Sequence, residues 1–169
     1  MKQSGLYLMS LTLAGCGFDT DQFINIEMYG VYTSPTDAAG DTTPQSLEVE
    51  LTSVALLNAS GNEQTVLYSG DPVELTVVDR SQLIYQKDLA DYQDSTFIQT
   101  IVTFNTSYIA NVKDLDPVTD ELSTGTVVSE DSFVVETGKS VTFSLKVSWQ
   151  NTVLGTEVVT DPTFELVLE

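Results

Sequence analysis

The chain contains one cysteine and no histidine. A single thiol cannot form a disulfide within the chain, so the folded domain must rely on its hydrophobic core for stability. The absence of histidine removes the commonest side-chain ligand of metal sites. It also excludes Ser-His-Asp and Cys-His catalytic arrangements, because both need an imidazole. We therefore expect no enzyme activity, and the catalytic alternative left open is a small hydrolase built on two carboxylates.

Positive charge is scarce as well. Six Lys and Arg residues stand against 25 Asp and Glu residues, which gives a formal net charge of −19. Such a surface repels phosphate backbones, so we expect no nucleic-acid partner. Electrostatic adsorption onto anionic lipid is also disfavoured, because that route needs clustered Lys or Arg. Any attachment to a membrane must therefore come from a covalent lipid.

No hydrophobic run is long enough for a membrane-spanning helix, which needs about 20 residues. The one apolar stretch near the start covers only residues 6–13. Lys2 precedes this stretch, and the small residues Ala14 and Gly15 follow it. A positive start, a short apolar centre and a small-residue end are typical of a signal peptide. We predict a signal peptide over residues 1–15, with cleavage after Gly15.

The four residues Leu13-Ala14-Gly15-Cys16 resemble the lipobox of bacterial lipoproteins. The resemblance implies that diacylglycerol is attached to the sulfur of Cys16 and that the new amino terminus is acylated. Acyl chains contribute about 0.8 kcal/mol per buried methylene, so two or three of them anchor a protein stably. An ordinary secretory signal that happens to precede a cysteine is the alternative. Gly17, and not an Asp resembling an inner-membrane retention signal, follows Cys16, so we favour the outer membrane of the cell envelope.

Residues 16–22 are expected to form a lipidated tether, and residues 23–169 a single domain. Alternation of apolar and polar residues recurs through this domain, and no long stretch has helical periodicity. The clearest case is residues 141–149, where five apolar residues occupy one parity of a strand. About eight to ten short strands without helices predict an all-β fold, a single antiparallel β-sandwich.

Alternation and turn residues together give the expected element boundaries. A bulge is predicted near Ser53, a hairpin turn at 58–62, and one helical turn at 87–93. Residues 97–104 are apolar on both parities, which predicts burial on both faces. Residues 105–131 are long, acidic and weakly patterned. The predicted strands are residues 23–32, 47–56, 65–68, 73–77, 83–85, 97–104, 126–128, 133–135, 141–149 and 164–168.

The stretch from residue 47 to 168 resembles a domain of uncharacterised bacterial lipoproteins, thought to form a transthyretin- or immunoglobulin-like sandwich. The resemblance covers most of the chain after the signal peptide. It departs from the expected pattern at Asp94-Ser95-Thr96, where a glycine-rich turn would stand. It implies a sandwich and an envelope location, and no activity. The segments that carry it are VELTVVD, LIYQKDLADYQDSTFIQTIVTFN, FVVETGKSVTFSLKVSW and DPTFELVLE.

An acidic loop is the candidate metal site. Asp114, Asp116, Asp120 and Glu121 offer several carboxylate oxygens, and Ca²⁺ takes six to eight oxygen ligands. The loop lacks the glycine and terminal glutamate of an EF-hand, so a solvated acidic loop is the alternative. Calcium binding to the folded state would raise the melting temperature in millimolar Ca²⁺.

Three evenly spaced aspartates and the single tryptophan also bear on function. Asp88, Asp91 and Asp94 are spaced by three residues, and a polar connection between strands is favoured over a shared helical face. Trp149 lies on the inward parity of its strand, which favours the core over a ligand groove.

The function predicted from these features is a non-enzymatic binding or assembly module, anchored by lipid in the cell envelope. It would contact another envelope or surface protein or its own copies. The strand over residues 65–68 could take part as an exposed edge. A calcium-dependent adhesin or ligand-binding protein and a carboxylate-based hydrolase are the alternatives. No cofactor is expected apart from the covalent lipid on Cys16 and, in the adhesin alternative, Ca²⁺.

Overall fold

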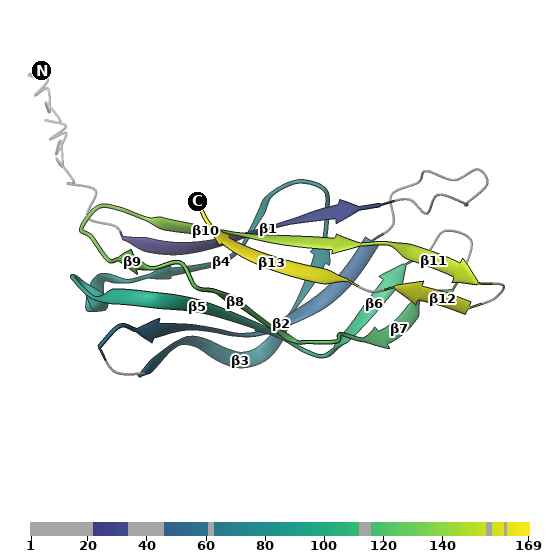
Figure 1. The fold of residues 1–169 in the computed structure, drawn as a ribbon, viewed down its shortest axis with the longest axis horizontal. Coiled ribbons are helices and arrows are strands. Elements are labelled where there is room, and N and C mark those ends of the chain that lie inside the picture. The colour runs from purple at the N-terminus through teal and green to yellow at the C-terminus, as the bar shows by residue number, and fades with distance from the viewer. Residues whose placement is uncertain (1–21, 34–45, 61–62, 112–115, 155–156, 161) are drawn as a thin grey trace, which may run out of the picture.

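Short alternating segments form two β-sheets that pack face to face (Figure 1). Thirteen strands and one short 3-10 turn lie in the described residues, and no helix among them is long and apolar enough to cross a membrane. The predicted all-β sandwich is confirmed.

The predicted signal peptide, its cleavage site at Gly15 and the lipid site at Cys16 lie outside the described residues. The backbone alone is described for residues 151–154 and 157–159. The computed structural model describes residues 22–33, 46–60, 63–111, 116–154, 157–160 and 162–169.

The smaller sheet has four strands in the order β13-β10-β1-β4. β1 and β10 run parallel, in register from Ile24 opposite Val141 to Tyr32 opposite Trp149, whereas the other neighbours are antiparallel. This pair corrects the expectation of a purely antiparallel sandwich. A long stretch of chain separates the two strands, so no tight hairpin forces an antiparallel pairing. In sheet order, these strands span Thr163–Leu168, Val141–Trp149, Phe23–Tyr32 and Gln82–Asp88.

The larger sheet is built on β2, which pairs with β3 along one edge and with β5 and β6 along the other. Beyond them, β8 and β9 pair with β5, and β7 pairs with β6. β3 therefore forms one border of the sheet. The strands span Ser46–Asn58 (β2), Gln64–Val77 (β3), Thr96–Phe104 (β5), Ser107–Asn111 (β6), Val118–Glu121 (β7), Thr126–Ser129 (β8) and Phe133–Val134 (β9).

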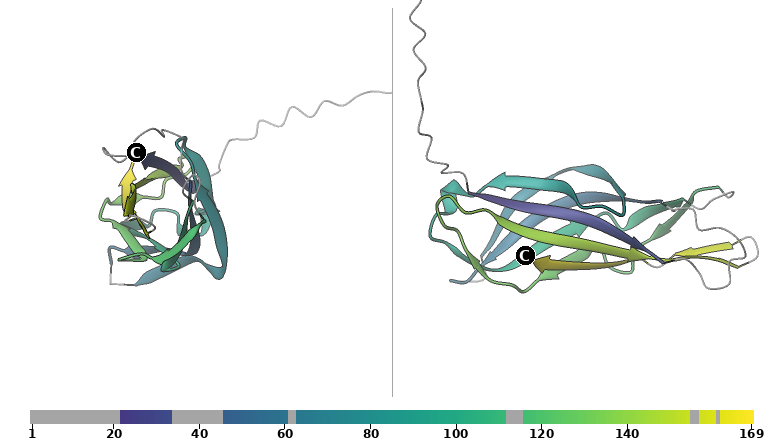
Figure 2. Two further views of the ribbon diagram at one scale, coloured as in Figure 1. Left: turned by 90° about the vertical axis from the view of Figure 1, so that its right-hand side faces the viewer. Right: turned by 90° about the horizontal axis from the view of Figure 1, so that it is seen from above.

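The sandwich is elongated along its strands and encloses its core when seen end on (Figure 2). A separate two-stranded hairpin, β11 (Asn151–Leu154) and β12 (Glu157–Thr160), extends one end beside β6 and β7 (Figure 1). The 3-10 turn η1 (Ala90–Tyr92) lies at the opposite end, after β4. It confirms in part the helical turn predicted over residues 87–93.

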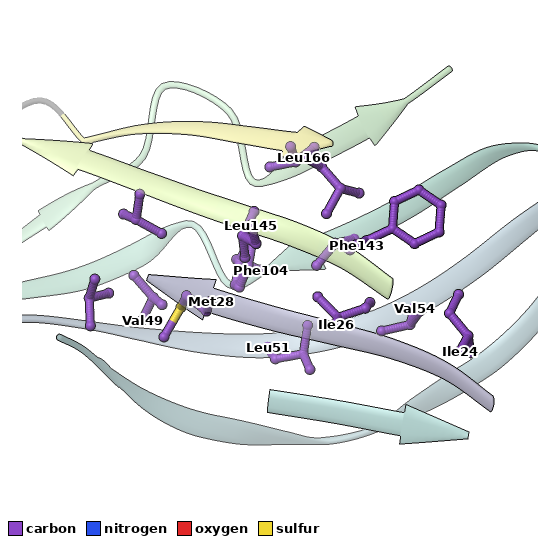
Figure 3. Packing of buried hydrophobic residues seen from close by; sticks show 14 of the residues in the cluster. Ile24, Ile26, Met28, Val49, Leu51, Val54, Phe104, Phe143, Leu145 and Leu166 are labelled. Atoms are coloured by element: carbon purple, nitrogen blue, oxygen red, sulfur yellow. The ribbon is translucent and has the colours of Figure 1, made fainter. Parts of the chain in front are cut away.

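The core lies between the inner faces of the two sheets (Figure 3). In each sheet the alternating apolar residues point inward, as the period of two requires. β1 and β10 supply one side of the core, and β2, β5 and β6 supply most of the other. The inward residues of β1, β10 and β2 are Ile24, Ile26, Met28, Phe143, Leu145, Val147, Leu47, Val49, Leu51 and Val54, all essentially inaccessible to solvent.

The structure corrects the predicted break after residue 68. The predicted strands 65–68 and 73–77, with the turn residues Gly70-Asp71-Pro72 between them, form one continuous strand, β3, which pairs with β2 on both sides of these residues. The pairing shifts register between Leu51 and Ser53, which confirms the bulge predicted near Ser53. An edge strand tolerates a proline because one of its sides needs no backbone donor. The turn residues therefore bend the strand without ending it.

Burial of residues 97–104 on both faces is also wrong. β5 buries Phe97, Val102 and Phe104, while Ile98 is exposed. The second apolar parity points to the outer face of the larger sheet. Within the described residues, this outer face has no covering layer. The weakly patterned residues 105–131 hold β6 and β7, which were not predicted, and β8, which was.

Trp149 closes the core at the end of β10, which confirms its predicted place. Its side chain is 4% exposed, and its ring lies 5.7 Å from that of Tyr32. The ring also covers Gly30 of the neighbouring β1. A Cβ atom at Gly30 would lie 2.7 Å from both Trp149 Cζ3 and Val77 Cγ1. Glycine is therefore required at this position by a close approach of two side chains.

We expect Gly30→Ala to lower the free energy of unfolding by about 1–3 kcal/mol, because the added methyl group overpacks the contact with Trp149. Gly70→Ala is the matched control, since a Cβ there meets only Tyr68 at 3.5 Å. Urea unfolding followed by tryptophan fluorescence measures both variants. Equal stability of the two variants would contradict the packing argument.

Candidate functional site

The predicted calcium ligands do not form a cluster among the described residues. Asp114 lies outside them, and Asp116, Asp120 and Glu121 are exposed. Asp120 and Glu121 are consecutive in β7, so their side chains point to opposite faces of the strand. Asp120 Oδ1 accepts a hydrogen bond from the backbone N–H of Glu121. In this part of the chain, no group of three acidic, histidine or cysteine side chains is arranged to hold a metal ion.

Two carboxylates follow β8, and one of them, Asp131, has a structural role. Asp131 Oδ2 accepts hydrogen bonds from the hydroxyl of Ser129 at 2.7 Å and from the backbone N–H of Leu168 at 3.2 Å. These two bonds lower the pKa of Asp131. Leu168 belongs to β13 of the smaller sheet, so Asp131 links the borders of the two sheets. The neighbouring Glu130 is exposed.

Asp88, Asp91 and Asp94 surround the 3-10 turn rather than sharing one helical face. Asp88 Oδ1 accepts the backbone N–H of Ala90 at 2.8 Å and caps the turn. Asp94 has a φ of 63°, the left-handed conformation that Asp tolerates better than most residues. All three aspartates are exposed. They are a polar connection between β4 and β5, as favoured from the sequence.

Three glutamates line a shallow hollow of about 190 Å³ on the outer face of the larger sheet. Glu48 and Glu50 lie on β2, and Glu74 of β3 stands directly opposite Glu50. Two asparagines hold the first two carboxylates: Asn111 Nδ2 donates to Glu48 at 2.9 Å, and Asn105 Nδ2 donates to Glu50 at 2.8 Å. Like charges on opposed strand positions are destabilising. Among the described residues, no positive side chain lines the hollow.

This glutamate hollow is a feature that sequence reasoning missed. Alternation along β2 puts Glu48 and Glu50 on one outer strand face, but Glu74 is their neighbour only through the pairing of β2 with β3. These are the acids that a carboxylate-based hydrolase would use. The remaining lining consists of apolar residues, hydroxyl groups and Asn105. The hydrolase stays a prediction, and the geometry adds no acid–base partner of another type.

The free border of β3 is the second candidate site. Among the described strands β3 pairs with β2 alone, so the opposite side of residues 65–68 carries backbone groups without a strand partner. Val66 is 56% exposed there. Tyr68 packs its ring 6.1 Å from that of Tyr85 on β4, which joins the borders of the two sheets at this point. Pro72, exposed further along the strand, interrupts the row of backbone donors.

A second hollow lies beside this border, between the two sheets. Its volume is about 390 Å³. Val66 and Leu67 of β3 form one wall. The other wall consists of Lys87 and Asp88 of β4 together with Tyr92 and its neighbours in η1. An extended segment added to the border of β3 would therefore pass over a hollow that offers apolar side chains, the ammonium group of Lys87 and the carboxylates of Asp88 and Asp91.

Comparisons of the chain with protein-family models, with curated proteins and with solved structures find no match. The lipobox and the resemblance to lipoprotein sandwich domains remain predictions from the sequence. The features that bear on function are therefore those of the described residues, above all the β3 border and the hollow beside it.

The Asp131 link gives a prediction for acidic pH. Because folding lowers the pKa of this carboxyl, its contribution is fully present above the ordinary pKa of an aspartate and is lost as the pH falls through the lowered value. We expect Asp131→Asn to melt below the unmodified chain at neutral pH, and the difference to vanish in strong acid. Differential scanning calorimetry across this pH range measures it.

Glu130→Gln is the matched control for Asp131→Asn. It removes the same charge from the adjacent position, where the side chain is exposed. We expect it to leave the melting temperature unchanged or to raise it slightly, because it lowers the net negative charge. A pH-independent loss in Asp131→Asn would argue against the ionised link.

Proposed function

We propose that this chain is a non-enzymatic binding or assembly module of the bacterial cell envelope, anchored in the outer membrane by a lipid on Cys16. Two features support the anchor: the signal-like residues 1–15 and the lipobox-like sequence that ends at Cys16. The net charge of −19 gives the domain no electrostatic attraction to anionic lipid, so a covalent anchor is the route that fits its surface.

The observation that carries the binding role is the free border of β3 beside a hollow. Residues 64–69 precede the interruption at Pro72, and Val66 and Leu67 form one wall of the hollow. In strand addition, backbone hydrogen bonds along a sheet border give affinity, and pockets for alternate side chains give specificity. The free border of β3 and the hollow beside it support this mode of binding. We assign to this border an extended partner segment that places apolar side chains against Val66, Leu67 and Tyr92.

The anchor is tested by intact mass spectrometry of the protein purified from its native host. We expect a chain that begins at Cys16 and carries the added mass of two or three acyl groups. Cys16→Ser should remove the acyl mass and release the protein from the membrane fraction. An unmodified chain beginning at Met1, or one cleaved at Cys16 without acyl groups, would contradict the anchor.

The β3 border is tested by cross-linking in intact envelopes. We expect a reproducible cross-linked protein partner that is lost in Val66→Glu, because a carboxylate would then be buried under the added strand. Val73→Glu is the matched control: it lies on the same strand beyond Pro72 and is 42% exposed. Equal loss in both variants, or the same partner retained in Val66→Glu, would contradict this site.

A further inference from the structure

One half of the larger sheet is built from segments that contain no charged residue, although 18% of the whole chain is charged. These segments come from six strands, β2, β3, β5, β6, β8 and β9, with their adjoining turns. Acids resume where the strands end, at Glu63, Asp94, Glu130 and Glu136. The uncharged segments are residues 52–60, 64–70, 95–111, 122–129 and 132–135.

Strand pairing aligns the outward residues of these segments into rows across the sheet. Ala55 pairs with Val66 on one side and Ile101 on the other, and Ile101 pairs with Val128. A neighbouring row holds hydroxyl groups: Ser53, Ser69, Thr103 and Thr126. Val66 and Val128 stand well exposed at the two ends of the apolar row, whereas Ala55 between them is only 2% exposed. We call the outer surface of these two rows, with Val134 of β9, the charge-free face.

We propose that the charge-free face packs against the same face of a second copy of this chain. Two copies with a net charge of −19 repel each other over most approaches, because six Lys and Arg residues cannot neutralise 25 acids. A contact through the acidic parts would bury carboxylates without partners, which is costly. The charge-free face lets two copies meet with their carboxylates left at the rim. This inference rests on the binding role proposed above and adds a second copy of the chain as a partner; the charge-free face shares Val66 with the β3 border and otherwise lies on other strands.

The size of the face sets the strength of the association. Four strand positions at about 4.8 Å and about eight residues at about 3.3 Å give an area on the order of 500 Å² per copy. A stable interface buries about 800 Å² per partner. The free association is therefore weak. Tethering both copies to one membrane raises their effective concentration, which makes a weak contact sufficient.

The test uses the full chain with Cys16→Ser, which removes the only thiol and with it acylation and disulfide dimers. Sedimentation equilibrium is measured at about 0.1 M and about 1 M NaCl, between which the Debye length shortens from about 10 Å to about 3 Å. We expect a reversible monomer–dimer equilibrium whose Kd falls at high salt, because the rim carboxylates then repel less.

Substitutions on and off the charge-free face show whether self-association depends on this face. Val128→Glu places a carboxylate from each copy in the contact, and we expect it to raise the Kd at least about tenfold. Val134→Glu, on the same face, should act alike. Val167→Glu is the matched control: Val167 is also a strand valine that is 43% exposed, as Val128 is, but it lies on the smaller sheet. It should leave the Kd unchanged, and thermal melting checks that each variant folds.

Two results would overturn the proposal. One is a monomer at both salt concentrations, which would leave an uncharged polysaccharide or a different protein as the occupant of the face. The other is equal weakening by Val128→Glu and Val167→Glu. Val66 belongs to both surfaces, so Val128→Glu is the variant that separates the two proposals. It should lose self-association but retain the envelope cross-link to a different protein that Val66→Glu loses.

Discussion

The smaller sheet depends on the parallel pairing of β1 with β10. β1 is the sole link between β4 on one side and β10 with β13 on the other. The pairing joins the first described strand to one near the end of the chain, so this sheet forms only when most of the sequence is present. It also places Ile26 and Met28 beside Phe143 and Leu145, which supply one wall of the core. Without a disulfide, this wall must be held by packing alone.

Charge is distributed so that the acidic chain can still pack two sheets. Acids lie at the turns and on outer faces, as in the glutamate hollow of β2 and β3 and in the aspartates around η1. Two ion pairs between side chains are present in the described residues, Lys139 with Glu136 and Lys146 with Glu165, and both are well exposed. Exposed pairs contribute little to stability. The core therefore carries the contact between the sheets, and the acids mainly decide which surfaces can meet a partner.

Alternation predicted the strands that have one buried and one solvated face. β1 and β10 have the predicted boundaries, because each carries a full row of inward apolar residues. Where local pattern and pairing diverge, the prediction failed. The turn residues before Val73 lie inside β3 because β2 pairs with the strand on both sides of them. The apolar outward parity of β5 was read as burial, although it forms part of the charge-free face. The opposition of Glu50 and Glu74 and the convergence of the β3 border with η1 depend on tertiary pairing that spacing does not encode.

The proposed anchor restricts how two copies can meet through the charge-free face. Leu89 after β4 donates its backbone N–H to Gln22, just before β1, so the tether enters at the η1 end of the sandwich. A two-fold axis in the contact plane can run across the strands or along them. An axis across the strands would put the two anchors at opposite ends, so both could reach one membrane only if the strands lay parallel to its surface. An axis along the strands keeps both anchors together and reverses the apolar row of one copy over the other. The small Ala55 of each copy then faces Ile101 of its partner, and Val66 faces Val128. The membrane anchor and the register of the sheet thus favour the same arrangement.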